Sequence, residues 1–196
     1  IIPVVNQAII NANIDKNQLN AIAYTRGPGL LGSLLVGSSF AKSLSMGLNI
    51  PLIEVNHMQA HLLAHFIEDC GNEKPTFPFI GVTISGGHTQ IVLVKNYFDM
   101  EIIGETLDDA IGETFDKCGK MLDLPYPAGP YVDKHSKNGD SNKHKFTKPR
   151  VGGLNYSFSG LKTGFMRYVE KEKNNNGDFI SKELDNLCAS LQYTIV

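Results

Sequence analysis

Apolar residues in the first third of the chain recur at helical and strand spacing in turn. Val5, Ile9 and Ala12 stand at helical spacing. The pattern that follows predicts a strand, a helix rich in small residues, a strand and a helix, at about 20–25, 30–47, 51–55 and 57–68. Strands that alternate with covering helices are typical of an α/β fold.

The remaining sequence predicts a β-meander and then helices. Strands are predicted at 79–85, 89–95 and about 100–104, and helices at 109–122, 160–172 and 180–196. A segment rich in Pro and Gly, 125–130, leads into a basic loop. We expect two halves: an α/β half at 1–95, truncated at its N-terminus, and the start of a second half at 96–196, with a helical insertion and the basic loop, truncated at its C-terminus.

Composition narrows the class of protein. The 196 residues are 42% hydrophobic and 19% charged, which is the balance of a soluble globular protein. No apolar run approaches the roughly 18 residues of a membrane span and no signal-peptide pattern opens the chain, so we expect a cytoplasmic protein. Three widely spaced cysteines, Cys70, Cys118 and Cys188, favour neither a disulfide framework nor a cysteine-based zinc site.

Positive charge gathers late in the chain. Residues 1–100 hold 5 of the 18 Lys and Arg residues. The segment 134–150 sets six cations against one acid, Asp140: Lys134, Lys137, Lys143, Lys145, Lys148 and Arg150. It is either a merely solvated loop or a loop that contacts an anion.

Two histidines four residues apart follow the strand predicted at 51–55. Asn56 can cap a helix, and His57 and His61 would then share one helix face, where both rings can reach one divalent metal ion. Two surface histidines by chance explain the spacing equally simply. Met58 stands where a zinc peptidase of the HExxH type has its glutamate, which disfavours that class.

A double glycine, Gly86-Gly87, separates two predicted strands. Without side chains there, backbone N–H groups can approach a phosphate, with Ser85 and Thr89 as further donors. If the turn needs a positive φ at Gly87, a valine there would conflict with it. The alternative is a plain two-residue hairpin.

Three further segments combine carboxylates or glycines with helix starts. In 104–117, Asp108 and Asp109 fit the N-terminal end of the helix that follows, whereas Asp116 lies inside it and suits ribose hydroxyls or a solvated face. In 126–133, Gly129 makes a rigid turn between prolines before Asp133, which a simple helix entry also explains. The loop 26–33 opens a helix as anion-binding loops do, although close packing of small residues explains its glycines as well.

In order and wording, six phrases together resemble the TsaD family of tRNA threonylcarbamoyladenosine transferases, once known as O-sialoglycoprotein endopeptidases. They are AYTRGPGLLGSLLVG (23–37), NHMQAH (56–61), SGGHTQ (85–90), GETLDDAIGETFDK (104–117), YPAGP (126–130) and NYSFSGLKT (155–163). His88 and the GETFDK wording are similar to the bacterial branch.

The resemblance implies an actin-like, sugar-kinase-like α/β fold of the ribonuclease H-like kind, in which two related halves hold a nucleotide. It implies that His57 and His61 bind one Fe²⁺ or Zn²⁺ ion and that Asp116, Gly129 and Asp133 contact the nucleoside. The lining of the adenylate site would be Thr83, Ile84, Ser85, Gly86 and Gly87. Implied partners are tRNA, threonylcarbamoyl-AMP, TsaB, TsaE and TsaC, the last as supplier of the adenylate.

From the basic segment we expect tRNA contacts at Lys143, Lys145, Lys148 and Arg150. The family's N-terminal strand pair with its phosphate-binding turn, its nucleotide-binding Asn and the Asp that is the third metal ligand have no counterpart here. The chain also opens on Ile1 without Met and stops at Val196 inside an apolar run. We therefore expect a fragment lacking both ends, inactive unaided.

Two other functions are open at this point. A kinase of the same superfamily would share the glycine turns but hold Mg²⁺ through carboxylates and water, whereas two imidazoles suit iron or zinc. A non-catalytic scaffold that binds partner subunits is the other.

Overall fold

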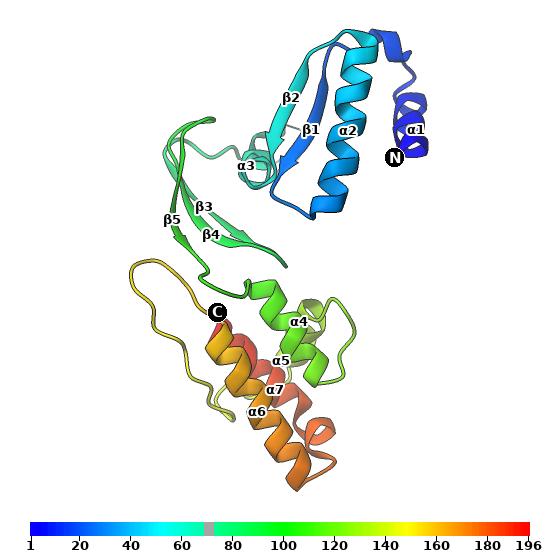
Figure 1. Ribbon diagram of the computed structural model, residues 1–196. Helices are drawn as coiled ribbons and strands as arrows, with labels where there is room; N and C mark the ends of the chain where they lie inside the picture. Colours follow the sequence, from blue (N-terminus) through cyan, green and yellow to red (C-terminus); the bar gives the residue numbers. More distant parts are fainter. Residues whose placement is uncertain (69–72) are drawn as a thin grey trace. The chain divides into compact units, whose positions relative to one another are not determined.

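A computed structural model describes residues 1–68 and 73–196, which divide into two units, Ile1–Pro75 and Thr76–Val196 (Figure 1). Cys70 lies outside the described residues. A boundary between residues 95 and 96, as predicted, would separate two strands of one antiparallel sheet, so the units do not follow the predicted halves.

The first unit is built on a βαβ arrangement. The strands β1 (Ile22–Gly27) and β2 (Leu52–Asn56) pair in parallel from Ile22↔Leu52 to Gly27↔Asn56, and α2 (Leu31–Leu48) connects them. The helix α1 (Ile2–Ala12) precedes β1, and α3 (His57–Leu63) follows β2 directly. Both α1 and α2 end at an asparagine in the left-handed conformation, Asn13 and Asn49, a common way to end a helix.

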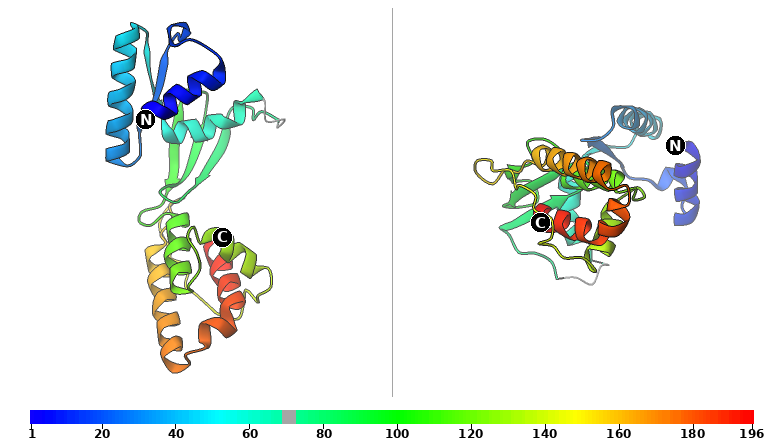
Figure 2. Two further views of the ribbon diagram at one scale, coloured as in Figure 1. Left: turned by 90° about the vertical axis from the view of Figure 1, so that its right-hand side faces the viewer. Right: turned by 90° about the horizontal axis from the view of Figure 1, so that it is seen from below.

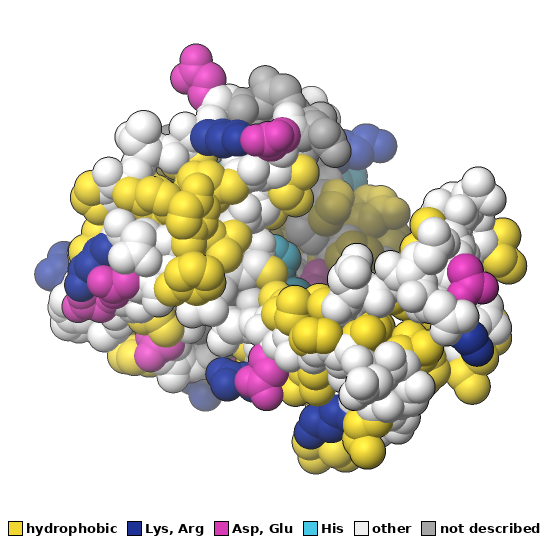
Figure 3. Space-filling model, turned by 90° about the horizontal axis from the view of Figure 1, so that it is seen from above, with side chains coloured by type: hydrophobic (Ala, Val, Ile, Leu, Met, Phe, Trp, Pro, Cys, Tyr) yellow, Lys and Arg dark blue, Asp and Glu magenta, His cyan; other side chains and the backbone are white. Residues whose placement is uncertain are grey.

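Much apolar surface of this unit is exposed. Among its described residues only Ala41, Ser45 and Leu62 are buried, whereas Leu31, Leu35, Val36 and Met46 of α2 are exposed. An apolar groove of about 660 Å³ lies between α1, β1 and α2. In the view of Figure 3, which draws both units, hydrophobic side chains gather in patches. A Cβ at Gly32, Gly37 or Gly47 would meet nothing within 4 Å, so these three glycines of α2 are not explained by close packing among the described residues.

The second unit joins a three-stranded antiparallel sheet to four helices. The sheet has the order β3 (Phe79–Ile84), β4 (Thr89–Val94), β5 (Met100–Glu105). The helices, which lie together beyond one end of this sheet (Figure 2), are α4 (Ile111–Met121), α5 (Gly129–Ser136), α6 (Ser159–Asn175) and α7 (Phe179–Ile195).

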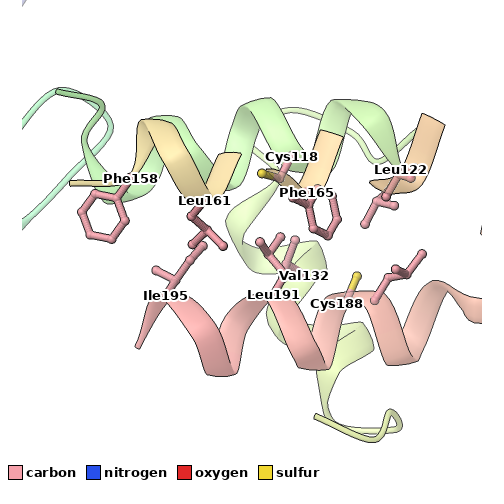
Figure 4. Packing of buried hydrophobic residues seen from close by; sticks show 11 residues of the cluster. Cys118, Leu122, Val132, Phe158, Leu161, Phe165, Cys188, Leu191 and Ile195 are labelled. Atoms are coloured by element: carbon pink, nitrogen blue, oxygen red, sulfur yellow. The ribbon is translucent and has the colours of Figure 1, made fainter. Parts of the chain in front are cut away.

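The hydrophobic core lies between these helices (Figure 4). Cys118 of α4, Leu122 directly after that helix, Phe165 of α6 and Leu191 of α7 are each at most 2% exposed. Burial raises the pKa of the Cys118 and Cys188 thiols to about 12, so both are neutral packing groups at physiological pH.

The α/β class and the order of the predicted elements are confirmed, with two differences. The helix predicted at 57–68 is α3 followed by a short 3-10 helix, Ala64–Phe66. A separate helix, α5, begins in the segment rich in Pro and Gly and extends into the first residues of the basic segment. Within the described parts of the chain, no helix combines the length and the apolar composition that crossing a bilayer requires.

Candidate functional site

The two histidines of the first unit converge on one point. Asn56 caps α3 by accepting hydrogen bonds from the N–H groups of Met58 and Gln59, at 2.9 and 3.1 Å, which fixes the start of the helix directly after β2. The Nε2 atoms of His57 and His61 are 3.2 Å apart, and their ring centroids are 4.5 Å apart. Both residues are exposed.

This geometry fits two ligands of one metal ion. Two nitrogens bound to a tetrahedral ion at about 2.0–2.1 Å stand about 3.3 Å apart. No group of three or more His, Cys, Asp or Glu side chains with metal-binding geometry occurs among the described residues. The described residues therefore offer two candidate ligands at this point, His57 and His61.

In the second unit, the glycine turn is joined to the start of α4. The Ser85 N–H donates to the His88 carbonyl at 2.9 Å, and the Ser85 hydroxyl accepts from the His88 N–H at 3.0 Å. The Ser85 carbonyl accepts instead from the Gly112 N–H, at 3.2 Å. The serine side chain thus replaces the backbone bond of a plain hairpin and leaves its carbonyl to hold α4.

Gly112 is the closest contact in this junction. A Cβ there would lie 2.8 Å from the Ser85 oxygen and 2.9 Å from both Cα and N of Gly86. The expectation of a positive φ at Gly87 is wrong, because among the described glycines only Gly27 and Gly153 have positive φ. A Cβ at Gly87 or Gly86 would meet nothing within 4 Å, so space beside the turn is open in this unit.

Asp116 stands one helical turn beyond Gly112 on α4, and residues four apart share a helix face. Its carboxylate accepts a 2.7 Å hydrogen bond from the Ala128 N–H, which fixes the turn before Gly129. Asp133, one turn along α5 from Gly129, pairs with Lys137 at 2.8 Å and accepts from Gln192 at 3.3 Å. The Lys137 ammonium and the Gln192 amide lower the pKa of Asp133 below its usual value.

These contacts connect the second-unit residues that the sequence singled out. The turn 85–88 touches Gly112, α4 carries Asp116 on the same face, and Asp116 holds the entry to α5 with Gly129 and Asp133. Thr83, on β3, is 9% exposed, and its Oγ1 is the buried side-chain atom that lacks a hydrogen-bond partner among the described residues. Gly112 lies inside one of the six phrases but was not among the predicted site residues; a glycine in the first turn of a helix, where it weakens the helix, was the available signal.

The sequence led us to expect Asp108 and Asp109 at the N-terminal end of α4. In the structure they do not cap α4 but hold α6. Asp108 accepts hydrogen bonds from the Ser157 hydroxyl at 2.6 Å and from the N–H groups of Phe158 and Ser159 at 2.7 and 3.2 Å. Asp109 is paired with Lys117 of α4 and Lys162 of α6. A carboxylate from the sheet side of the chain therefore caps α6 from fifty residues away.

The basic segment is anchored at His144 and Lys143, and its contact with an anion stays a prediction. His144 is 8% exposed, with Nδ1 2.9 Å from the Tyr168 hydroxyl and Nε2 3.3 Å from a Glu183 oxygen. Lys143 pairs with Glu183 at 2.7 Å. Of the four cations expected to contact tRNA, Lys143 is thus paired, whereas Lys145, Lys148 and Arg150 have no carboxylate partner in the described residues.

Comparison with known proteins identifies the family. The family model of TsaD, tRNA N6-adenosine threonylcarbamoyltransferase, matches residues 1–196. Proteins named tRNA N6-adenosine threonylcarbamoyltransferase from Christiangramia forsetii and Riemerella anatipestifer are 64% and 61% identical over the whole chain. The chain belongs to the TsaD family, as the six phrases predicted.

The chain spans 58% of the length of these two relatives. Among solved structures, YeaZ from Pseudomonas aeruginosa is similar over 90% of this chain and 77% of its own, at 13% identity and a TM-score of 0.38, which is too low to support an argument.

Proposed function

We propose that the protein to which this chain belongs transfers a threonylcarbamoyl group from threonylcarbamoyl-AMP to the exocyclic amine of the adenine 3′ of the anticodon in tRNA. Family membership supports this activity and the actin-like fold. The observation that carries the proposal is the continuous line of contacts from the turn 85–88 through Gly112 and Asp116 to Gly129. It joins three separate motifs into one surface.

That surface offers the groups that an adenylate needs. Gly86 and Gly87 leave open space beside backbone N–H groups, which suits a phosphate, and Thr83 and Ile84 at the end of β3 lead through Ser85 into the same turn. Asp116 uses one carboxylate oxygen for the Ala128 N–H, so the other oxygen can accept from a ribose hydroxyl. Gly129 and Asp133 follow on the adjoining face of α5.

His57 and His61 are proposed to hold one Fe²⁺ or Zn²⁺ ion, with further ligands from outside the described residues. When bound, such an ion can polarise the carbamoyl group and grip anionic parts of the substrate. The histidine pair also favours the transferase over a kinase of the same superfamily, because hard Mg²⁺ prefers oxygen ligands.

The proposed reaction depends mainly on the orientation of the adenylate relative to the tRNA amine. The tRNA amine nitrogen attacks the carbamoyl carbon, the bond from that carbon to the phosphate oxygen of AMP breaks, and the amine gives up a proton as AMP leaves. Residues 83–87 and Asp116 would hold the adenylate while the amine approaches, which makes the reaction effectively intramolecular. TsaB and TsaE are proposed as working partners, TsaC as supplier of the adenylate, and the cytoplasm as the location.

Asp116→Asn in the complete protein tests the proposal, with Asp123→Asn as its control. Asparagine keeps an oxygen for the Ala128 N–H but removes the charge, so we expect activity to fall about ten-fold or more without unfolding. Asp123 is exposed, beyond α4, in a left-handed conformation that Asn tolerates. The readout is threonylcarbamoyladenosine in tRNA by mass spectrometry. Full activity of Asp116→Asn, or no product from the parent protein assayed with TsaB, TsaE and threonylcarbamoyl-AMP present, would reject the assignment.

A further inference from the structure

The extended segment 145–150 and the exposed side of α7 form a surface on which aromatic and cationic groups meet. The Lys148 ammonium lies over the Tyr193 ring, 5.4 Å from its centroid. Tyr193 is 61% exposed, although its neighbours Thr194 and Leu191 on α7 are buried. Among the described residues, the Tyr193 ring is thus exposed beside a cation and is not part of the core, an arrangement that suits a ligand.

The charges of the basic segment 134–150 divide into two groups. Lys137 and Lys143, nearer its start, are paired with Asp133 and Glu183 at 2.8 and 2.7 Å. Lys145, Lys148 and Arg150 are exposed and have no carboxylate partner within residues 1–68 and 73–196. Lys134 is exposed and without a carboxylate partner in the described residues as well, but three of the four unpaired cations lie at the end of the segment that contacts Tyr193.

Two hollows of about 480 Å³ each meet at Lys148. The first is lined by Tyr193 with polar groups of Ser136, Ser141 and Gln192. The second is lined by Arg150 with polar groups of Asn155 and Ser157. A ring with hydroxyl and amide groups suits an unstacked base, and a neighbouring hollow with a guanidinium suits phosphate.

The segment is also held in place. Its start is tied to α7 because the Asp140 N–H donates to Asn186 at 2.8 Å and the His144 N–H donates to Ser190 at 3.2 Å. The buried His144 ring is held between Tyr168 and Glu183. Anchoring at residues 140–144 limits the freedom of the cations that follow, which lowers the ordering cost of binding.

We propose that Tyr193, Lys148 and Arg150 form a docking surface for single-stranded RNA, in which an unpaired base stacks on Tyr193 and the adjoining phosphates contact Lys148, Arg150 and Lys145. The proposal rests on the proposed function, since it places a looped-out part of the tRNA here. An acidic protein could neutralise the cations, but it would leave the exposed ring and its polar hollow unused. Stacking on an aromatic ring combined with phosphate contacts is how proteins bind unpaired nucleotides.

The test measures the affinity of the complete protein for a fluorescent anticodon stem-loop RNA over a salt series. Tyr193→Ala should weaken binding about five- to 150-fold at an unchanged salt slope, while Tyr193→Phe should bind like the parent. Lys148→Ala with Arg150→Ala should lower the slope by about 1.4, because each lost phosphate contact in a single strand removes about 0.7. The matched control is Lys171→Ala with Lys173→Ala, two exposed cations of α6.

Each of three results would refute the proposed docking surface. The first is that Tyr193→Ala binds the RNA as tightly as the parent. The second is that the Lys171 and Lys173 control loses as much salt slope as the Lys148 and Arg150 variant, and the third is that a fully paired RNA of the same length binds equally well. Tighter binding of a polyglutamate peptide than of the RNA would assign the surface to an acidic protein instead. Melting temperatures show that each variant is folded. Failure here is separable from failure of the proposed function, because the latter predicts transfer to tRNA by the parent protein wherever the RNA docks.

Discussion

The carboxylate of Asp108 accepts a 2.7 Å hydrogen bond from the backbone N–H of Phe158, fifty residues further along the chain. With the Ser159 N–H and the Ser157 hydroxyl as further donors, one side chain caps the start of α6 and ties it to the end of β5. In most helices, the capping residue comes from the helix's own N-terminus, so this cap is also a tertiary contact.

Asp108→Ala should lower the free energy of unfolding by about 1 kcal/mol, the usual cost of a lost helix cap. For a chain of this length, that corresponds to a fall in melting temperature of about 2–4 °C. Glu170→Ala, at an exposed position on the same helix, should change stability by less than about 0.5 kcal/mol. Equal melting temperatures for the two variants would show that the cap contributes nothing.

Stability should fall in acid through Asp108 and Asp109. Desolvation raises the pKa of each carboxyl, but the hydrogen bonds to Asp108 and the Lys162 and Lys117 ammonium groups beside Asp109 outweigh it, so both pKa values lie below the ordinary value. A lowered pKa stabilises the fold above the unfolded-state value of about 3.9, and this contribution is lost as pH falls through the folded-state pKa.

Urea unfolding of the parent protein and Asp108→Asn at several pH values measures this effect. The parent should be the more stable at pH 7, and the difference should shrink below about pH 4, where the Asp108 carboxyl of the unfolded chain becomes protonated, and vanish once pH falls below the lowered folded-state pKa. A difference that stays constant down to pH 3 would mean that the charge of Asp108 is not what stabilises α6.

Metal binding is expected to depend on the two converging imidazoles and not on the next histidine. His57→Ala and His61→Ala in the complete protein should each lose bound iron or zinc, because removing one ligand of the pair opens the site. His65→Ala is the matched control, an exposed histidine on the short 3-10 helix after α3. Mass-spectrometric metal analysis decides the matter: parental metal content in either of the first two variants would refute the site.

Local sequence patterns predicted the features that depend on residues close together in the sequence. The spacing of His57 and His61 and the capping asparagine were predictable because a helix places residues four apart on one face. The cap of α6 by Asp108 and the pairing of Lys143 with Glu183 were not, since each joins residues at least 40 positions apart. The adjacency of Tyr193 and Lys148 was hidden for the same reason.

The sequence left α5 open as a helix entry near Asp133 but did not define it as an element, because it is only eight residues long and begins with Gly129 and Pro130, residues that usually indicate a turn. Pro in the first turn of a helix costs no hydrogen bond, so the same residues also allow a helix to start there. Burial of Val132 in the core between the helices fixes it in place, which is a tertiary effect.

Two glycine substitutions should distinguish the structure of the turn 85–88 from the binding of a phosphate beside it. Gly112→Ala places a Cβ against backbone atoms of Ser85 and Gly86, so the turn must shift. We expect a loss of about 1–3 kcal/mol in stability and weaker binding of a non-hydrolysable adenylate analogue. Gly164→Ala controls for the substitution itself, because a Cβ at that position on α6 meets nothing within 4 Å.

Gly87→Val should behave differently, because Gly87 does not have a positive φ and a Cβ there would meet nothing within 4 Å. Its melting temperature should stay close to that of the parent, while the valine side chain fills the space proposed for phosphate and abolishes binding of the analogue. Calorimetry gives the affinity and thermal melting gives the stability of each variant. If Gly87→Val binds the analogue like the parent, the phosphate does not lie beside this turn; if Gly112→Ala is as stable as the parent and binds equally well, the contact between α4 and the turn does not position the site.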